Sequence, residues 1–146
     1  GDIYIGLLNG NNNLCSISSL VKKAVFDSLN GYDENLAYED YDFWIRASTI
    51  YNFDYVDKIL VQKRVLKDSM YTLLTKKNNK KTRRFNYSTY LILQKAFKLN
   101  RTKEEFVAML KRIHFEMTVA YKTRDFHLLM KYIFLELKVR STILYK

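Results

Sequence analysis

The stretch that most constrains the fold is residues 30–46, where a tight turn is followed by acidic residues and the start of a helix. Asn30-Gly31 predicts the turn, because both residues tolerate a positive φ angle. Three carboxylates then lie where the helix dipole and free N–H groups favour negative charge: Glu39, Asp40 and Asp42. Asp42 and Arg46 are four residues apart and can pair along one helix face. Acids in this position serve either as helix caps or, on a rigid element, as a general base.

The first part of the chain combines short helices with segments rich in strand-forming residues. We expect a strand or extended segment over 1–10, a short strand over 14–17, a helix from Ser18 or Ser19 to Leu29, the acidic helix to about Tyr51, and two short strands within 52–65. In the acidic helix, Trp44, Ala47 and Tyr51 recur at helical spacing. This spacing predicts that the helix packs one face on a core.

The second part of the chain is predicted to be helical almost throughout. We expect a helix that begins within 69–75, a basic loop or helix end over 76–84, and helices over 85–99, 102–121 and 126–141 or beyond. Thr102 and Glu105 have the spacing of a capping box, and Asp125 can cap the last helix. That last helix gathers apolar side chains on one face, which packs on the core or contacts a membrane: Phe126, Leu129, Met130, Ile133, Phe134 and Leu137.

Together these patterns predict an α+β chain that is mainly α. We expect a small α/β piece in residues 1–67 and a basic helical bundle in residues 68–146. A nucleotide-binding α/β fold needs parallel strands with phosphate-holding loops at their ends. The sequence contains no Gly-rich phosphate loop. We therefore expect the chain to be a fragment whose nucleotide-binding half precedes Gly1.

The charge of the chain is distributed very unevenly. Residues 1–57 carry three basic residues against nine acids, whereas residues 58–146 carry 22 basic residues against six acids. Such asymmetry predicts an anionic partner for the second half. That partner is an anionic membrane surface or a lipid-diphosphate acceptor, with a nucleic-acid-binding or protein-interaction module as the alternative. Because the sequence has no recognisable nucleic-acid motif, we expect no nucleic-acid partner.

The remaining reactive residue types predict no further chemistry. A single cysteine, Cys15, excludes an intrachain disulfide and suits a reducing cytoplasm. His114 and His127 fall in different predicted helices without a second ligand at metal spacing, so we expect no metal site. No apolar run approaches the length of a spanning helix.

Four pieces of the first part resemble the catalytic domain of family 2 inverting glycosyltransferases, which have the GT-A fold. Ser16-Ile-Ser-Ser-Leu-Val-Lys-Lys-Ala-Val-Phe26 resembles the family's acceptor-side strand and helix, and Asn30-Gly-Tyr-Asp-Glu34 resembles its Gly-(Phe/Tyr)-Asp-Glu turn. Glu39-Asp-Tyr-Asp-Phe-Trp-Ile-Arg46 resembles its Glu-Asp-x-Asp-(Leu/Phe)-Trp-x-Arg helix, and Lys63-Arg64 with Ser69 resembles the strand that follows. The order and spacing of these pieces carry the resemblance over a little more than a third of the chain.

The resemblance implies a role for each residue of the acidic motif. Asp40 matches the general base, which removes the proton of the acceptor hydroxyl while that oxygen attacks the anomeric carbon with inversion. Glu39 would shape the acceptor loop or touch the acceptor. Asp42 is a structural partner or a substrate contact, as is Arg46. Trp44 packs in the core or forms a platform on which an acceptor stacks.

The resemblance also implies a donor site that this chain completes only in part. Arg64 would reach the diphosphate of a nucleotide-sugar donor or end a solvated strand. Many relatives carry a histidine two residues later, where this chain has Leu66. The full-length enzyme would use a divalent cation, Mg²⁺ or Mn²⁺, and a saccharide or lipid-linked acceptor. Asp40 and Asp42 have Asp-x-Asp spacing but match the later motif, so we expect no metal on this chain. We expect a cytoplasmic protein, peripheral at the inner face of the cell membrane.

Overall fold

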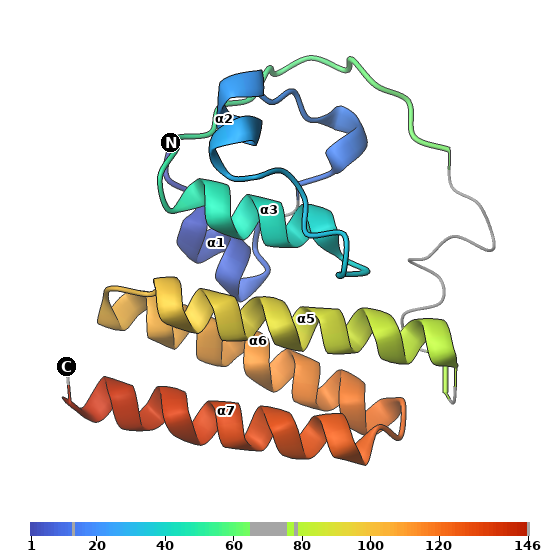
Figure 1. Ribbon diagram of the computed structural model, residues 1–146, viewed down its shortest axis with the longest axis vertical. Helices are drawn as coiled ribbons and strands as arrows, with labels where there is room; N and C mark the ends of the chain where they lie inside the picture. The colour runs from blue at the N-terminus through green and yellow to red at the C-terminus, as the bar shows by residue number, and fades with distance from the viewer. Residues whose placement is uncertain (13, 65–75, 78, 146) are drawn as a thin grey trace.

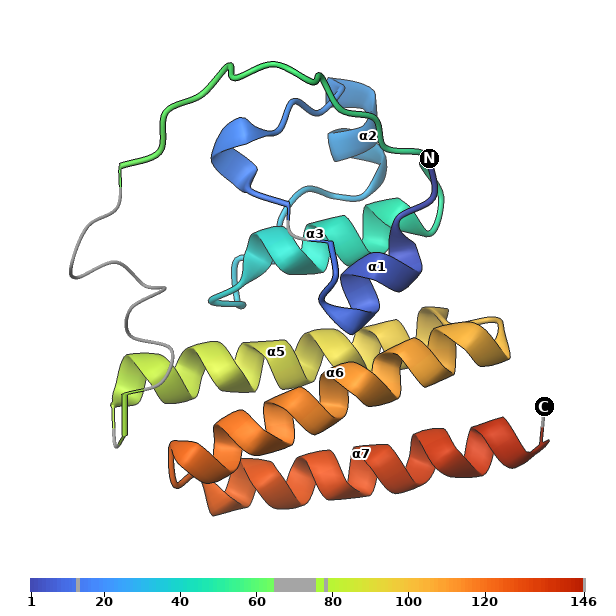
Figure 2. The ribbon, with the colours of Figure 1, turned by 180° about the vertical axis from the view of Figure 1, so that it is seen from behind.

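The computed structural model describes residues 1–12, 14–64, 76–77 and 79–145, and it is mainly helical. Three long helices run side by side below a group of shorter ones (Figures 1 and 2). The short elements are α1 (Tyr4–Asn9), the 3-10 helix η1 (Ser16–Ser18), α2 (Lys23–Ser28) and α3 (Glu39–Ser48); the long helices are α5 (Lys80–Leu99), α6 (Lys103–Lys122) and α7 (Phe126–Tyr145).

Polar side chains fix the starts of the three long helices. Asn79 accepts hydrogen bonds from the backbone N–H groups of Lys81 and Thr82 at the start of α5. The predicted capping box of α6 is confirmed: Thr102 Oγ1 accepts from the N–H of Glu105 at 3.3 Å, and Glu105 Oε2 accepts from the N–H of Thr102 at 3.0 Å. Asp125 Oδ1 accepts from the N–H of Leu128 in α7, as predicted for its cap. These bonds satisfy N–H groups that have no partner inside a helix.

Two groups of buried apolar side chains form the core. The first lies between the short elements and the upper side of the long helices, and it contains Tyr4, Leu7, Leu8, Leu36, Tyr41, Phe43, Trp44, Ile45, Ala47, Ile92, Ala96 and Ala108. The second lies among the long helices and contains Tyr90, Leu93, Phe106, Met109, Ile113, Ala120, Leu128, Tyr132, Leu135 and Val139. The first group contains residues from both predicted parts of the chain, 1–67 and 68–146. The acidic helix α3 therefore packs directly on the long helices.

The strands predicted for the first part are not found in the described residues. Residues 4–9 form α1 instead, and residues 16–18 form η1. Residues 52–64 have no regular structure, and several of their apolar side chains are exposed. Gly1 and Phe53 do exchange two backbone hydrogen bonds, through the N-terminal amine and the Phe53 N–H. A strand needs a continuous partner for its N–H and C=O groups, and this single exchange does not provide one.

Several helix limits differ from the prediction. The helix expected from Ser18 or Ser19 begins at Lys23, after an extended stretch, and α5 begins at Lys80 rather than at residue 85. Part of the basic stretch 76–84 is therefore the first turn of a helix. The helix expected within 69–75 lies outside the described residues.

The last helix does not pack the face that its sequence suggests. Its buried residues are Leu128, Tyr132, Leu135 and Val139. Four of the six residues expected on the packed face are exposed, namely Phe126, Met130, Phe134 and Leu137. Both sides of α7 are apolar, so periodicity alone does not identify the side that faces α5 and α6.

Candidate functional site

The turn at residues 30–31 is fastened to the acidic helix by one arginine. Asn30 and Gly31 have φ angles of 56° and 64°, as the sequence predicts. Arg46 Nε donates to Asp42 Oδ2 at 2.8 Å, which confirms the predicted pair. Its two terminal nitrogens donate to the carbonyl oxygens of Leu29 at 2.6 Å and Gly31 at 2.8 Å. The guanidinium thus fixes the position of α3 relative to the preceding turn.

Asp42 is a buried structural carboxylate. Only 1% of its surface is exposed. Its Oδ1 accepts a hydrogen bond from Lys95 Nζ of α5 at 2.8 Å, while its Oδ2 accepts from Arg46. The same lysine nitrogen lies 2.7 Å from Asp33 Oδ2 in the loop before α3. A buried carboxylate with two cationic partners holds elements together and is not available to take a proton from a substrate.

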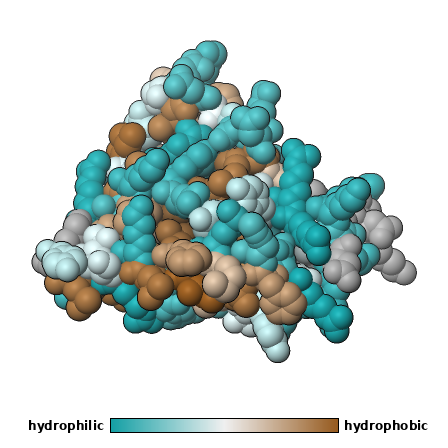
Figure 3. Space-filling view, turned by 60° about the horizontal axis from the view of Figure 1, so that its bottom comes forward, coloured by the Kyte–Doolittle hydropathy of each residue, from teal (hydrophilic) through white to brown (hydrophobic). Residues whose placement is uncertain are grey.

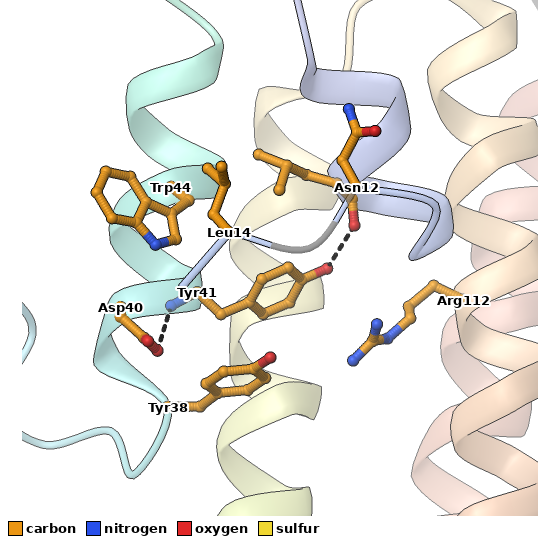
Figure 4. A pocket seen from close by; sticks show the side chains of 8 residues that line it. Asn12, Leu14, Tyr38, Asp40, Tyr41, Trp44 and Arg112 are labelled. Atoms are coloured by element: carbon orange, nitrogen blue, oxygen red, sulfur yellow. Dashed lines mark hydrogen bonds between the residues drawn. The ribbon is translucent and has the colours of Figure 1, made fainter. Parts of the chain in front are cut away.

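Asp40, two residues earlier, is in a different environment. It is half-buried, and it forms no ion pair with any described residue. Its Oδ1 accepts a hydrogen bond from the N–H of Tyr41 at 2.8 Å. Asp40 therefore also stabilises the start of α3, where the helix dipole favours a negative charge. The carboxylate also lines a pocket beside α1 and α6, together with Asn12, Leu14, Tyr38, Trp44 and Arg112 (Figure 4).

The pocket is small, and the indole N–H of Trp44 in its wall is an unused donor. Its cavity volume is about 20 Å³, which is room for about one water molecule. Trp44 is 4% exposed and packs in the core, and its indole Nε1 has no hydrogen-bond partner among the described residues. Trp44 therefore belongs to the core and also contributes to the wall beside Asp40. A buried donor of this kind would gain a partner from an oxygen placed in the pocket.

Arg112 of α6 closes the opposite side of the pocket. Its guanidinium carbon lies 5.2 Å from the centre of the Tyr41 ring, and its Nε lies 2.8 Å from Glu116 Oε1. Burial raises the pKa of Glu116, and this effect outweighs the adjacent Arg112, which acts to lower that pKa. The two groups form an ion pair on α6 that is largely buried. Figure 4 shows the Arg112 side chain on the side of the pocket opposite Trp44.

The two tyrosines of the pocket keep their protons at neutral pH. Burial raises the pKa of Tyr41 to about 12 and also raises the pKa of Tyr38. Tyr41 donates its phenolic hydrogen to the carbonyl oxygen of Leu7 at 3.1 Å. Among the residues that line the pocket, Asp40 is therefore the carboxylate that can accept a proton.

The other predicted site residues do not line this pocket. Glu39 is exposed on the first turn of α3, and Arg64 is exposed in the irregular segment 52–64. No group of three or more potential metal ligands is found within the described part of the chain. Asp42, which has Asp-x-Asp spacing with Asp40, is occupied by its two cations.

Sequence reasoning missed the contributions of the helical part to this site. Lys95 and Arg112 come from α5 and α6, more than 50 residues after Asp42 in the sequence. The predicted helices place both residues on amphipathic segments, but nothing in their spacing indicates which acid each one meets. Asn12 and Leu14 lie in a segment that the sequence predicts as a loop and a short strand, and nothing in that pattern indicates a pocket wall.

Comparison with known proteins adds nothing to this geometry. No family model, curated protein or solved structure matches the chain.

Proposed function

We propose that residues 1–64 carry the acceptor side of a family 2-like inverting glycosyltransferase, with Asp40 as the general base. The observation that carries the proposal is the contrast between two neighbouring acids on α3. Asp42 is neutralised by Arg46 and Lys95, whereas Asp40 lines a pocket and has no cationic partner among the described residues. An unpaired carboxylate on a rigid helix is the arrangement that a general base requires.

The proposed reaction is a single displacement. The Asp40 carboxylate takes the proton of an acceptor hydroxyl as the hydroxyl oxygen forms a bond to the anomeric carbon of the donor sugar. The bond from that carbon to the nucleotide diphosphate breaks, and the diphosphate leaves with the electron pair. Attack from the side opposite the leaving group inverts the anomeric carbon. Because a carboxylate is a modest base, correct placement of the hydroxyl supplies much of the rate enhancement.

The walls of the pocket support an acceptor hydroxyl beside Asp40. The unused Nε1–H of Trp44 can donate to an acceptor oxygen, and the guanidinium of Arg112, which is paired with Glu116, lines the opposite wall. With room for about one water molecule, the pocket fits a hydroxyl group rather than a whole sugar ring. We propose that the nucleotide-sugar donor is held by another part of the enzyme, outside residues 1–146.

The described residues do not fit the divalent cation that the resemblance implies. They contain no cluster of potential ligands, and Asp42 is committed to Arg46 and Lys95. No step assigned to this chain uses a metal. When bound elsewhere in the full-length enzyme, a cation would neutralise the charge of the departing diphosphate.

The test is turnover of the full-length enzyme with uridine and guanosine diphosphate sugars. Asp40→Asn keeps an oxygen that can accept from the Tyr41 N–H but removes the base, so turnover should fall by about a hundredfold or more. Donor affinity should stay near that of the wild type. The matched control is Asp54→Asn, because Asp54 Oδ1 accepts from the next N–H in the same way, at 2.9 Å, and lies on an exposed segment.

Turnover by Asp40→Asn above about half of the wild-type value would contradict the proposal. An equal loss in Asp54→Asn would do the same, since it would show that the effect is not specific to the pocket. Circular dichroism of both variants separates loss of chemistry from loss of fold.

A further inference from the structure

Helix α7 carries apolar side chains on two opposite sides. Its inner side, formed by Leu128, Tyr132, Leu135 and Val139, is buried against α5 and α6. Its outer side is also apolar, and its large exposed members are Phe126, Met130, Phe134, Leu137, Leu144 and Tyr145. Because Phe126, Met130, Phe134 and Leu137 recur at intervals of three and four residues, they form one continuous stripe.

The stripe is visible as apolar surface along the underside of the molecule, with hydrophilic side chains around it (Figure 3). Phe134 alone is 66% exposed. Scattered apolar residues are normal on a protein surface, but a contiguous row on one helix marks a contact with a membrane or with another protein.

The charges beside the stripe indicate what covers it. Residues 122–145 carry five basic residues against two acids. Of the two acids, Asp125 caps the helix, and Glu136 is paired with His114 and Arg140. Lys131 and Lys138 lie along the same flank of α7, where both contact aromatic rings of α5 and form no ion pair with a described residue.

A basic hollow adjoins one end of the stripe. It has a volume of about 400 Å³ and lies between the starts of α5 and α7, where it is lined by Arg83, Arg84, His127 and Lys131. Asp125, whose Oδ1 caps α7, is the one acid in the lining. Tyr87 provides an aromatic wall, and Lys131 Nζ lies 5.8 Å from the centre of its ring. The hollow has the charge and the size to receive a phosphate group.

We propose that the outer side of α7 lies on the surface of an anionic phospholipid bilayer, with lipid phosphates at the basic hollow. An apolar stripe flanked by lysine and arginine is the pattern of a helix that rests in the interface. A second copy of the chain fits the stripe less well, because its α7 would bring the same cations against these. Within the described residues, no helix combines the length and hydropathy needed to cross a membrane.

The experiment measures sedimentation of the whole chain with lipid vesicles. Vesicles of phosphatidylcholine mixed with phosphatidylglycerol should bind the wild type, and pure phosphatidylcholine should bind it much less. Phe134→Ser removes a large side chain from the stripe without touching the buried side of α7, and it should weaken binding by about tenfold. The matched control is Ile50→Ser, which alters a residue that is 65% exposed beyond α3; its binding should be unchanged.

Two further readings distinguish the stripe from the charges. The double variant Arg83→Gln/Arg84→Gln should bind anionic vesicles more weakly than the wild type. When Phe134→Trp is added to this double variant, the fluorescence of the new tryptophan should still report insertion of the stripe. Because Trp44 is buried, the emission of a tryptophan at position 134 is distinct from the native signal and should shift to the blue on anionic vesicles. Soluble inorganic phosphate should bind the hollow without this shift, which separates a lipid phosphate from a free one.

Several results would overturn the proposal. Equal binding to neutral and anionic vesicles would remove the role of the charges, and unchanged binding of Phe134→Ser would remove the role of the stripe. A dimer of the wild type that dissociates on the Phe134→Ser substitution, with no vesicle binding, would assign the stripe to a second copy.

Discussion

Lys95 Nζ lies 2.8 Å from Asp42 Oδ1, and this ion pair joins the middle of α5 to the first turns of α3. The same nitrogen lies 2.7 Å from Asp33 Oδ2, so one lysine connects the loop, the acidic helix and the long helices. Arg46 completes the arrangement from within α3. The pocket around Asp40 depends on this connection, because α3 supplies Asp40 and Trp44 while α6 supplies Arg112.

The first prediction concerns the stability that Asp42 provides. Asp42→Asn leaves Arg46 and Lys95 without their shared carboxylate, and we expect the free energy of unfolding to fall by about 3 kcal/mol, as for breaking a buried ion pair. Asp40→Asn should change it by less than about 0.5 kcal/mol, because Asp40 forms no ion pair with a described residue. Urea-induced unfolding followed by circular dichroism measures both variants.

A similar loss of stability in the two variants would contradict the division of roles between these acids. It would mean that Asp40 also supports the fold, and a loss of turnover in Asp40→Asn would no longer identify a base.

The second prediction is that the contribution of Lys95 to stability depends on pH at both extremes. The hydrogen bond from Lys95 lowers the pKa of Asp33 below its ordinary value of 3.8. This contribution is complete above pH 3.8 and is lost as the pH falls through the lowered pKa. Burial tends to lower the pKa of Lys95, but its hydrogen bonds to Asp33 and Asp42 outweigh burial and raise it above 10.5. That contribution is complete below pH 10.5 and is lost as the pH rises through the raised pKa.

The measurement is the difference in unfolding free energy between wild type and Lys95→Met across the pH range. We expect a plateau between the two limits, a partial decline at low pH where the pair with Asp33 is lost, and a larger decline at high pH where Lys95 loses its charge. Lys23→Met is the control, because Lys23 and Asp27 form an exposed pair on α2; its difference should stay near zero throughout. A Lys95→Met difference that does not change with pH would contradict the assigned ion pairs.

The sequence predicts the local features of this molecule much better than its long-range ones. The capping box of Thr102 and Glu105, the pair of Asp42 and Arg46, and the turn at Asn30-Gly31 are confirmed. Each of them depends on residues no more than four positions apart, so spacing and backbone geometry determine them.

The missed features depend on contacts between distant segments. The residues of 52–64 favour strands, but the structure offers them no continuous partner strand among the described residues. The second partner of Asp42, Lys95, comes from α5, and Arg112 in the far wall of the pocket comes from α6. No local pattern assigns either residue to α3. The two apolar sides of α7 likewise leave its orientation to be decided by packing.

The third prediction concerns Gly31, whose φ of 64° lies in the left-handed region. A Cβ atom at this position would meet Cε1 of the Phe26 ring at 3.0 Å, and that ring packs on Tyr32 and Phe43 with centroid distances of 5.2 and 5.4 Å. The Gly31 carbonyl also accepts a hydrogen bond from Arg46, so the turn cannot relax without disturbing the ion pair with Asp42.

Gly31→Ala should therefore lower the free energy of unfolding by about 1–3 kcal/mol, from backbone strain and displacement of the Phe26 ring. Asn30→Gly is the matched control, because Asn30 has a φ of 56° and glycine adopts this conformation without strain. Its free energy of unfolding should stay within about 1 kcal/mol of the wild type. Urea-induced unfolding measures both variants. If the free energy of unfolding of Gly31→Ala equals that of the wild type, the turn does not need its left-handed backbone. There would then be no physical reason to expect glycine at this position before the acidic helix.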